Sequence, residues 1–211
     1  AVGYQTLYSM SGSAGTGENT AVGYKAGYAM TTGTQNTIMG ASAGDGINTG
    51  FQNTTIGYAA GGALTNGSYN TAIGTNALSN QGGSSGATAV GQYCLGSANG
   101  ANNTGLGAQA MYNMNSGGNN TALGYRAGRY YGSGTDGLTT ANNCVYIGEQ
   151  ARGNADSMTN EIVIGSNAIG AGGSNTVTIG DDNITAVYMA EDAGATVHCA
   201  AVTEGSALRI K

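Results

Sequence analysis

The most regular feature of this sequence is an apolar residue that directly precedes a glycine. The pair recurs eleven times, and most successive glycines lie 17 residues apart, with extremes of 15 and 24. The glycines are Gly3, Gly23, Gly40, Gly57, Gly74, Gly91, Gly107, Gly124, Gly148, Gly165 and Gly180. Eleven copies at a nearly constant spacing indicate a repeat protein in which each repeat stacks on the next.

Two further columns flank the apolar position. A threonine stands two residues before it in seven repeats, and Val145, Ile162 and Val177 take that place later in the chain. Residues two apart on a strand point to the same side, and we expect both columns to point inward. The expected structural core is Val22, Met39, Ile56, Ile73, Val90, Leu106, Leu123, Ile147, Ile164 and Ile179.

Small and polar positions complete the repeat. Alanine usually follows the glycine by three residues, as at Ala60 and Ala77, and suits a second, tightly packed wall. Asparagine precedes the threonine in six repeats, so stacked coils would align a ladder of side-chain amides. The glycine itself allows a sharp turn or a close approach of two backbones. Gly, Asn, Thr and Ser disfavour helix throughout.

These patterns predict an all-β fold, a parallel β-solenoid or β-roll with coils of about 17 residues. Residues 1–184 form the expected solenoid of about eleven coils, with an insertion at 129–141 where the spacing reaches 24. Residues 185–211 form an expected strand-like neck segment. Because the sequence opens within the motif at Ala1, we expect it to be part of a longer protein.

Composition indicates that one such chain does not stand alone. Val, Ile, Leu and Phe together supply 29 of 211 residues, while only 8% of residues are charged. Burial of a few small side chains per coil scarcely offsets the entropy of ordering about 17 residues. We therefore expect a parallel homotrimer, packed through the alanine column and the segment 185–190.

Charge and cysteine content exclude several classes of partner. Lys and Arg total six, so the clustered cations of a nucleic-acid-binding surface are missing. No apolar run is long enough to cross a membrane, and no membrane insertion is expected of this segment. Cys94, Cys144 and Cys199 lie far apart and His198 is the only histidine, so we expect small, partly buried cysteines, no metal site and no cofactor.

Three stretches carry a specific resemblance. N-T-A-V-G-Y-K-A-G at 19–27, N-T-A-I-G-T-N-A-L at 70–78 and N-T-A-L-G-Y-R-A-G at 120–128 resemble the repeats of phage tail-fibre proteins. N-E-I-V-I-G at 160–165 and N-T-V-T-I-G at 175–180 are similar to the β-roll head repeats of trimeric autotransporter adhesins. The resemblance implies a structural tail-fibre segment of a virion that projects or forms the host-attachment device, outside the cell. A trimeric adhesin on a bacterial surface is the alternative.

Two further classes fit less well. Regular threonine columns can order water, so an ice-binding solenoid is a minor alternative; we disfavour it because the same column carries Val and Ile and is expected to be interior. An enzyme is not expected, because the acidic residues scatter over different columns and no catalytic set forms around His198.

The insertion supplies the candidate contact with a host-surface receptor, whether glycan or protein. Arg129, Tyr130, Tyr131 and Asp136 combine a cation, two aromatic rings and an acid, which are residue types common at binding hot spots. A tolerated insertion without a role, or a clasp between subunits, explains the same residues and is the preferred interpretation, because surface loops accept insertions at little cost.

Overall fold

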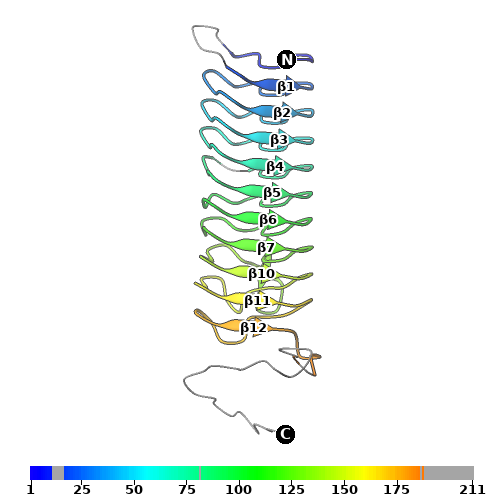
Figure 1. The fold of residues 1–211 in the computed structure, drawn as a ribbon, viewed down its shortest axis with the longest axis vertical. Coiled ribbons are helices and arrows are strands. Elements are labelled where there is room, and N and C mark those ends of the chain that lie inside the picture. Colours follow the sequence, from blue (N-terminus) through cyan, green and yellow to red (C-terminus); the bar gives the residue numbers. More distant parts are fainter. Residues whose placement is uncertain (11–16, 81, 186, 188–211) are drawn as a thin grey trace, which may run out of the picture.

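The protein is a parallel β-solenoid in which each repeat contributes one short strand to a single long sheet (Figure 1). The computed structural model describes residues 1–10, 17–80, 82–185 and 187. Ten strands stack in sequence order, and the described residues contain no helix. The strands are β1 (Thr20–Val22), β2 (Thr37–Met39), β3 (Thr54–Ile56), β4 (Thr71–Ile73), β5 (Thr88–Val90), β6 (Thr104–Leu106), β7 (Thr121–Leu123), β10 (Val145–Ile147), β11 (Ile162–Ile164) and β12 (Val177–Ile179).

The register between neighbouring coils matches the alignment of the repeats. Thr54 pairs with Thr71 and Ile56 with Ile73, and every neighbouring pair of strands follows the same rule. An isolated parallel bridge joins Val2 to Val22 and extends the stack by one level. The predicted parallel solenoid with coils of about 17 residues is therefore confirmed.

The repeat glycine is required for two reasons at once. Gly74 has a φ of +124°, which L side chains rarely adopt, and a Cβ there would lie 2.8 Å from the carbonyl carbon of Gly91 on the next coil. The other repeat glycines from Gly3 to Gly148 lie in the same way against the glycine of the following coil. Each level thus rests directly on the backbone of the next.

The expected asparagine ladder runs through the interior. The Asn53 side chain donates to Asn36 Oδ1 at 3.0 Å and to the Gly67 carbonyl at 2.9 Å, and its own Oδ1 accepts from Asn70. Ala87 interrupts the ladder, which resumes with Asn103 and Asn120. Five of these asparagines are at most 1% exposed, so the amides satisfy one another where water is excluded. They are Asn36, Asn53, Asn70, Asn103 and Asn120.

The inner walls consist of small side chains on one side and longer apolar ones on another. The alanine column is fully buried, as the sequence predicted, and a second wall contains Met30, Ile47, Leu64 and Met114. In the nine strands of the long sheet from β1 to β11 the central residue also points inward. In seven of these nine strands it is Ala, Gly, Val or Tyr, as at Ala72 and Ala89. This leaves the residues at both ends of each strand on the other side.

The longest repeat carries the insertion as a hairpin. Strands β8 (Tyr130–Tyr131) and β9 (Asp136–Gly137) pair antiparallel between β7 and β10, within the expected insertion at 129–141. Leu138 then returns to the interior, where it is fully buried. Of the expected neck segment 185–211, only Thr185 and Val187 belong to the described residues.

Candidate functional site

The outer sheet face is the broadest regular surface of the solenoid. We define it as the two outward columns of the ten-stranded sheet, one residue from each end of every strand. Met39 is 47% exposed, Leu106 48% and Ile179 54%, whereas the central residue Ile38 of β2 is fully buried. An apolar column therefore runs along the length of the shaft, in contact with solvent in the single chain.

The prediction that this apolar column forms the core of the chain is wrong. Val22, Met39, Ile73, Leu106, Leu123, Ile164 and Ile179 are exposed, and Ile56, Val90 and Ile147 are only half-buried. The residues are in line along the stack, as predicted, but they face outward. The interior between the sheet and the alanine column takes one residue from each strand, the central one, and in most coils that residue is smaller than the apolar one that follows it.

The threonines share this outer face and have free hydroxyls. Thr20, Thr37, Thr54, Thr71, Thr88, Thr104 and Thr121 lie in register, half-buried or exposed. Among the described residues none of these seven hydroxyls makes a hydrogen bond. The prediction that this threonine column lies in the interior is therefore wrong, and burial does not count against ice binding.

The alanine column is equally unable to serve as an interface between chains. Ala60, Ala77 and Ala110 are fully buried within their own chain. The prediction that this column packs against neighbouring subunits is wrong, because the chain already covers it on every side. The other segment assigned to that packing, 185–190, lies outside the described residues apart from Thr185 and Val187.

The hairpin residues proposed for receptor contact are largely engaged by their own chain. The Arg129 guanidinium lies 4.8 Å from the Tyr130 ring centroid and 5.1 Å from that of Tyr112, and it also donates to Gln109. Tyr131 packs against the hydrophobic core and bridges to Gly153. Asp136 alone is exposed. The structure brings Arg129 and Tyr130 together but presents no joint surface of all four residues.

A second set of contacts fastens the end of the insertion to the next coil. Asp156 accepts hydrogen bonds from the Thr139 hydroxyl at 2.6 Å and from the Thr140 backbone N–H at 3.1 Å. Arg152 Nε donates to the Gly132 carbonyl at 2.9 Å. These bonds favour a structural role for the insertion within one chain, as a clasp between coils.

The coils after the insertion bury a carboxyl group. Glu161 is fully buried in the column occupied by asparagine earlier in the chain. It accepts hydrogen bonds from the Tyr146 hydroxyl and the Asn154 N–H, each at 3.3 Å. Burial raises the pKa of the Glu161 carboxyl above its ordinary value, and these two bonds offset only part of that effect.

The cysteines behave as the sequence predicted wherever they are described. Cys94 and Cys144 are both free and fully buried. Burial raises the pKa of the Cys94 thiol to about 12. Such a thiol stays protonated and packs as a small apolar side chain. Cys199 lies outside the described residues.

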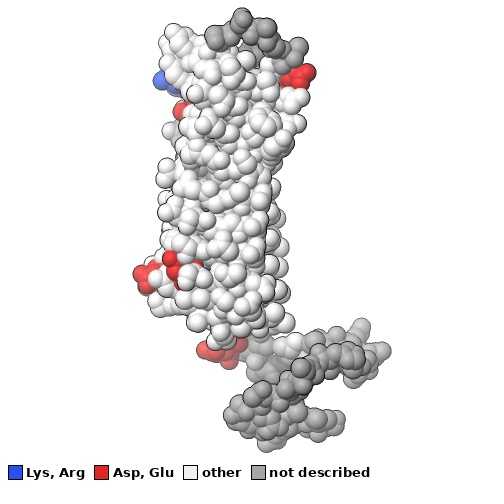
Figure 2. Space-filling model, turned by 90° about the vertical axis from the view of Figure 1, so that its left-hand side faces the viewer, with Lys and Arg blue, Asp and Glu red and all other residues white. Residues whose placement is uncertain are grey.

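Charged residues are confined to the two ends of the shaft. The sequence has no Asp, Glu, Lys, Arg or His between Asp45 and Arg126. Figure 2 shows the consequence on one face: the middle of the shaft is uncharged, with acidic side chains near both ends. The described residues contain no cluster of three side chains suited to a metal ion, and no helix among them could span a membrane.

Comparison with protein-family models, with curated proteins and with solved structures found no match to this chain. The sequence identified both columns of the outer sheet face and their common side. It missed that this side points outward, for which the residue between the two columns, alanine or glycine in five of the ten strands, was the available signal.

Proposed function

We propose that this chain is one subunit of a parallel homotrimeric fibre that projects an attachment device, as the resemblance to phage tail fibres suggests. The observation that carries the proposal is the outer sheet face, an uninterrupted apolar column on the outside of a single chain. Contiguous exposed apolar surface of this kind marks a site of association.

Identical copies of the chain are the occupants that fit this face. The apolar residue recurs once per coil, so a parallel copy at the same level presents a matching residue to every coil. Each strand offers only two outward residues, which makes the face narrow. Three narrow faces around one axis enclose their aliphatic columns together, whereas two faces leave the edges of the contact open to water.

The fibre geometry is consistent with a projecting role. In Figure 1 the first strand and the last strand of the sheet lie at opposite ends of the stack, so further segments can continue the shaft at either end. A virion tail fibre and a trimeric adhesin on a bacterial surface share this geometry. The repeats at 19–27 and 120–128, which resemble those of tail fibres, favour the first.

Introducing charged side chains on the outer sheet face tests the proposal. We expect the protein to sediment at about three times its chain mass of 20.7 kDa and the double variant Ile73→Glu, Leu106→Glu to sediment as a monomer, because three carboxylates per level cannot share a dry axis. Gly83→Glu is the matched control, since a side chain at Gly83 meets nothing within 4 Å. A wild-type monomer, or an unaffected double variant, would refute the trimer.

Ice binding is the second candidate, and one observation favours it. Seven threonine hydroxyls stand in register on a regular sheet without partners among the described residues. Against it, the adjacent column varies from Val22 to Met39 to Leu106, which gives an uneven surface suited to interdigitating side chains rather than to a lattice. If the protein is a monomer that adsorbs to ice, and Thr71→Tyr abolishes adsorption, this candidate replaces the fibre.

A further inference from the structure

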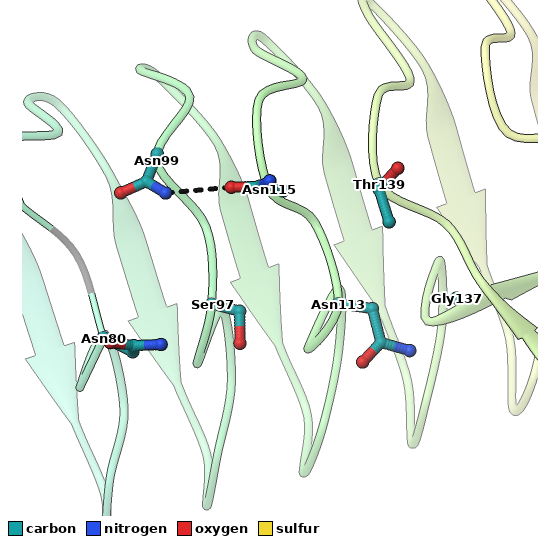
Figure 3. A pocket seen from close by; sticks show the side chains of 7 residues that line it. All are labelled: Asn80, Ser97, Asn99, Asn113, Asn115, Gly137 and Thr139. Carbon is teal, nitrogen blue, oxygen red and sulfur yellow. Dashed lines mark hydrogen bonds between the residues drawn. The ribbon is translucent and has the colours of Figure 1, made fainter.

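A polar groove crosses four successive coils on a part of the surface that includes no residue of the outer sheet face. Asn80, Ser97, Asn99, Asn113, Asn115, Gly137 and Thr139 line it, and its volume is about 510 Å³ (Figure 3). Two rows run along the fibre axis: Asn80, Ser97 and Asn113 form one, and Asn99, Asn115 and Thr139 the other. Gly137 and Thr139 belong to the insertion, which closes one end.

Hydrogen bonds within the chain fix the orientation of the amides. The Gly82 N–H donates to Asn99 Oδ1 at 3.3 Å, which directs Asn99 Nδ2 toward Asn115 Oδ1 at 2.9 Å. Within the part of the chain that the structure describes, that leaves Asn115 Nδ2 as a free donor. Asn113 Nδ2 donates to the Arg129 carbonyl at 3.1 Å, and no described residue donates to Asn113 Oδ1, which is left as an acceptor.

Two more lining groups are also open to a ligand. Neither the Asn80 side-chain amide nor the Ser97 hydroxyl makes a hydrogen bond to any described residue. The groove therefore offers an ordered set of donors and acceptors, part of which is held in place by bonds on the far side of each amide. Groups oriented in advance lose little entropy when a ligand binds.

The chemistry of the lining selects an uncharged, hydroxyl-rich ligand. None of the seven lining residues is charged, and the sequence from 46 to 125 contains no charged residue. No aromatic or aliphatic side chain lines the groove, so a peptide would find no pocket for its side chains. A sugar hydroxyl both donates and accepts, which matches alternating amide groups.

We propose that this groove binds a neutral oligosaccharide lying along the fibre axis. The assignment deepens the proposed attachment function, on which it rests for its biological role, and moves the expected receptor contact. The hairpin residues Tyr130 and Tyr131 do not line the site; instead the insertion forms its end wall through Gly137 and Thr139. Gly137 lies against Asn113, where a Cβ would come within 2.6 Å of Nδ2.

The test uses the whole chain and a panel of neutral hexasaccharides: maltohexaose, cellohexaose, chitohexaose and a mannohexaose. Titration calorimetry is expected to detect binding of at least one of them in the micromolar to millimolar range. Ser97→Trp, which fills the groove, and Asn113→Leu, which removes the acceptor, are each expected to weaken that binding at least tenfold. Ala29→Trp places the same ring at the corresponding position of an earlier coil and is expected to leave binding unchanged.

Several outcomes would overturn the proposal. They are the absence of binding across the panel at millimolar concentration, binding that Ser97→Trp leaves intact, and equal binding of a polygalacturonate or a neutral peptide. Sedimentation of the same samples separates this failure from that of the fibre. Because one chain forms the whole groove, a monomer that binds sugar refutes the trimer alone, and a trimer that binds none refutes the groove alone.

Discussion

The coils from β1 to β7 and the coils from β10 to β12 share one backbone plan but fill it differently. The first set buries asparagine, alanine and longer Ile, Leu and Met side chains at fixed positions. In the second set Cys144 and Glu161 occupy the asparagine column, and Tyr146 replaces the small central residue of the strand. The stacked backbone thus tolerates chemical change inside the coil where the new buried polar group finds a partner, as Glu161 does in the Tyr146 hydroxyl.

The insertion marks the change between the two sets. Leu138 fills the interior at the level where the regular repeat ends, and Tyr146 packs beyond it in the same core cluster. A larger interior residue is accommodated there because Gly128 and Gly153 lie against the Tyr146 ring and hydroxyl. Both sets keep the stack of repeat glycines, without exception from Gly3 to Gly148. The close approach of backbones at these glycines is therefore the strictest constraint on the sequence of the repeat.

The largest effect is therefore expected at that stack. Gly74→Ala introduces a Cβ 2.8 Å from the Gly91 carbonyl carbon at a φ of +124°. Backbone strain of about 1–2 kcal/mol adds to overpacking of about 1–3 kcal/mol, so the free energy of unfolding should fall by about 2–5 kcal/mol. Denaturant titration measures it. Gly82→Ala, in open space, is the control, and equal losses in both variants would contradict the stacking argument.

Breaking the asparagine ladder should cost somewhat less. Asn53→Ala removes both donors and the acceptor of a buried amide, so the Asn70 backbone N–H and the Gly67 carbonyl lose the partners that the Asn53 side chain gives them. The expected loss is about 2–3 kcal/mol, the cost of stranding buried polar groups. Asn66→Ala, at an exposed asparagine that accepts one bond from Thr49, should cost well under half as much. Similar losses at the two sites would show that burial of the ladder contributes little.

The smallest effect is expected in the pH dependence of stability, through the carboxyl group that the later coils bury at Glu161. The pKa of Glu161 is raised above 4.5, so the folded chain retains a proton that the unfolded chain releases as pH increases from 4.5. Stability should therefore decline as pH rises through the interval up to the raised pKa, and Glu161→Gln should flatten this decline. Thermal unfolding between pH 4 and 8 measures it.

The exposed Glu149→Gln is the matched control for that series. Asp45, whose pKa burial also raises, contributes a slope of the same sign in the earlier coils, so the wild-type decline is the sum of both. If Glu161→Gln leaves the decline unchanged, the buried carboxyl is ionised in the folded chain and its neighbours stabilise the charge.

Much of the architecture follows from the sequence alone. The recurrence of an apolar residue before glycine set the coil length, the register of the strands and the position of the insertion. The ladder of Asn36, Asn53 and Asn70 followed from the same alignment, because residues at equal places in stacked coils must lie on top of one another. Cys94 was correctly expected among small buried residues for this reason.

The side on which each column lies is what only the tertiary structure decided. Period-two alternation states that Thr71 and Ile73 share a side, but not whether that side is inner or outer. The answer depends on the space that the alanine column and the wall of Leu64 leave inside the coil, which takes the central residue Ala72 and leaves Ile73 on the outer side. The groove likewise needed the folded chain, because Asn80, Asn113 and Gly137 become neighbours only when their coils are stacked.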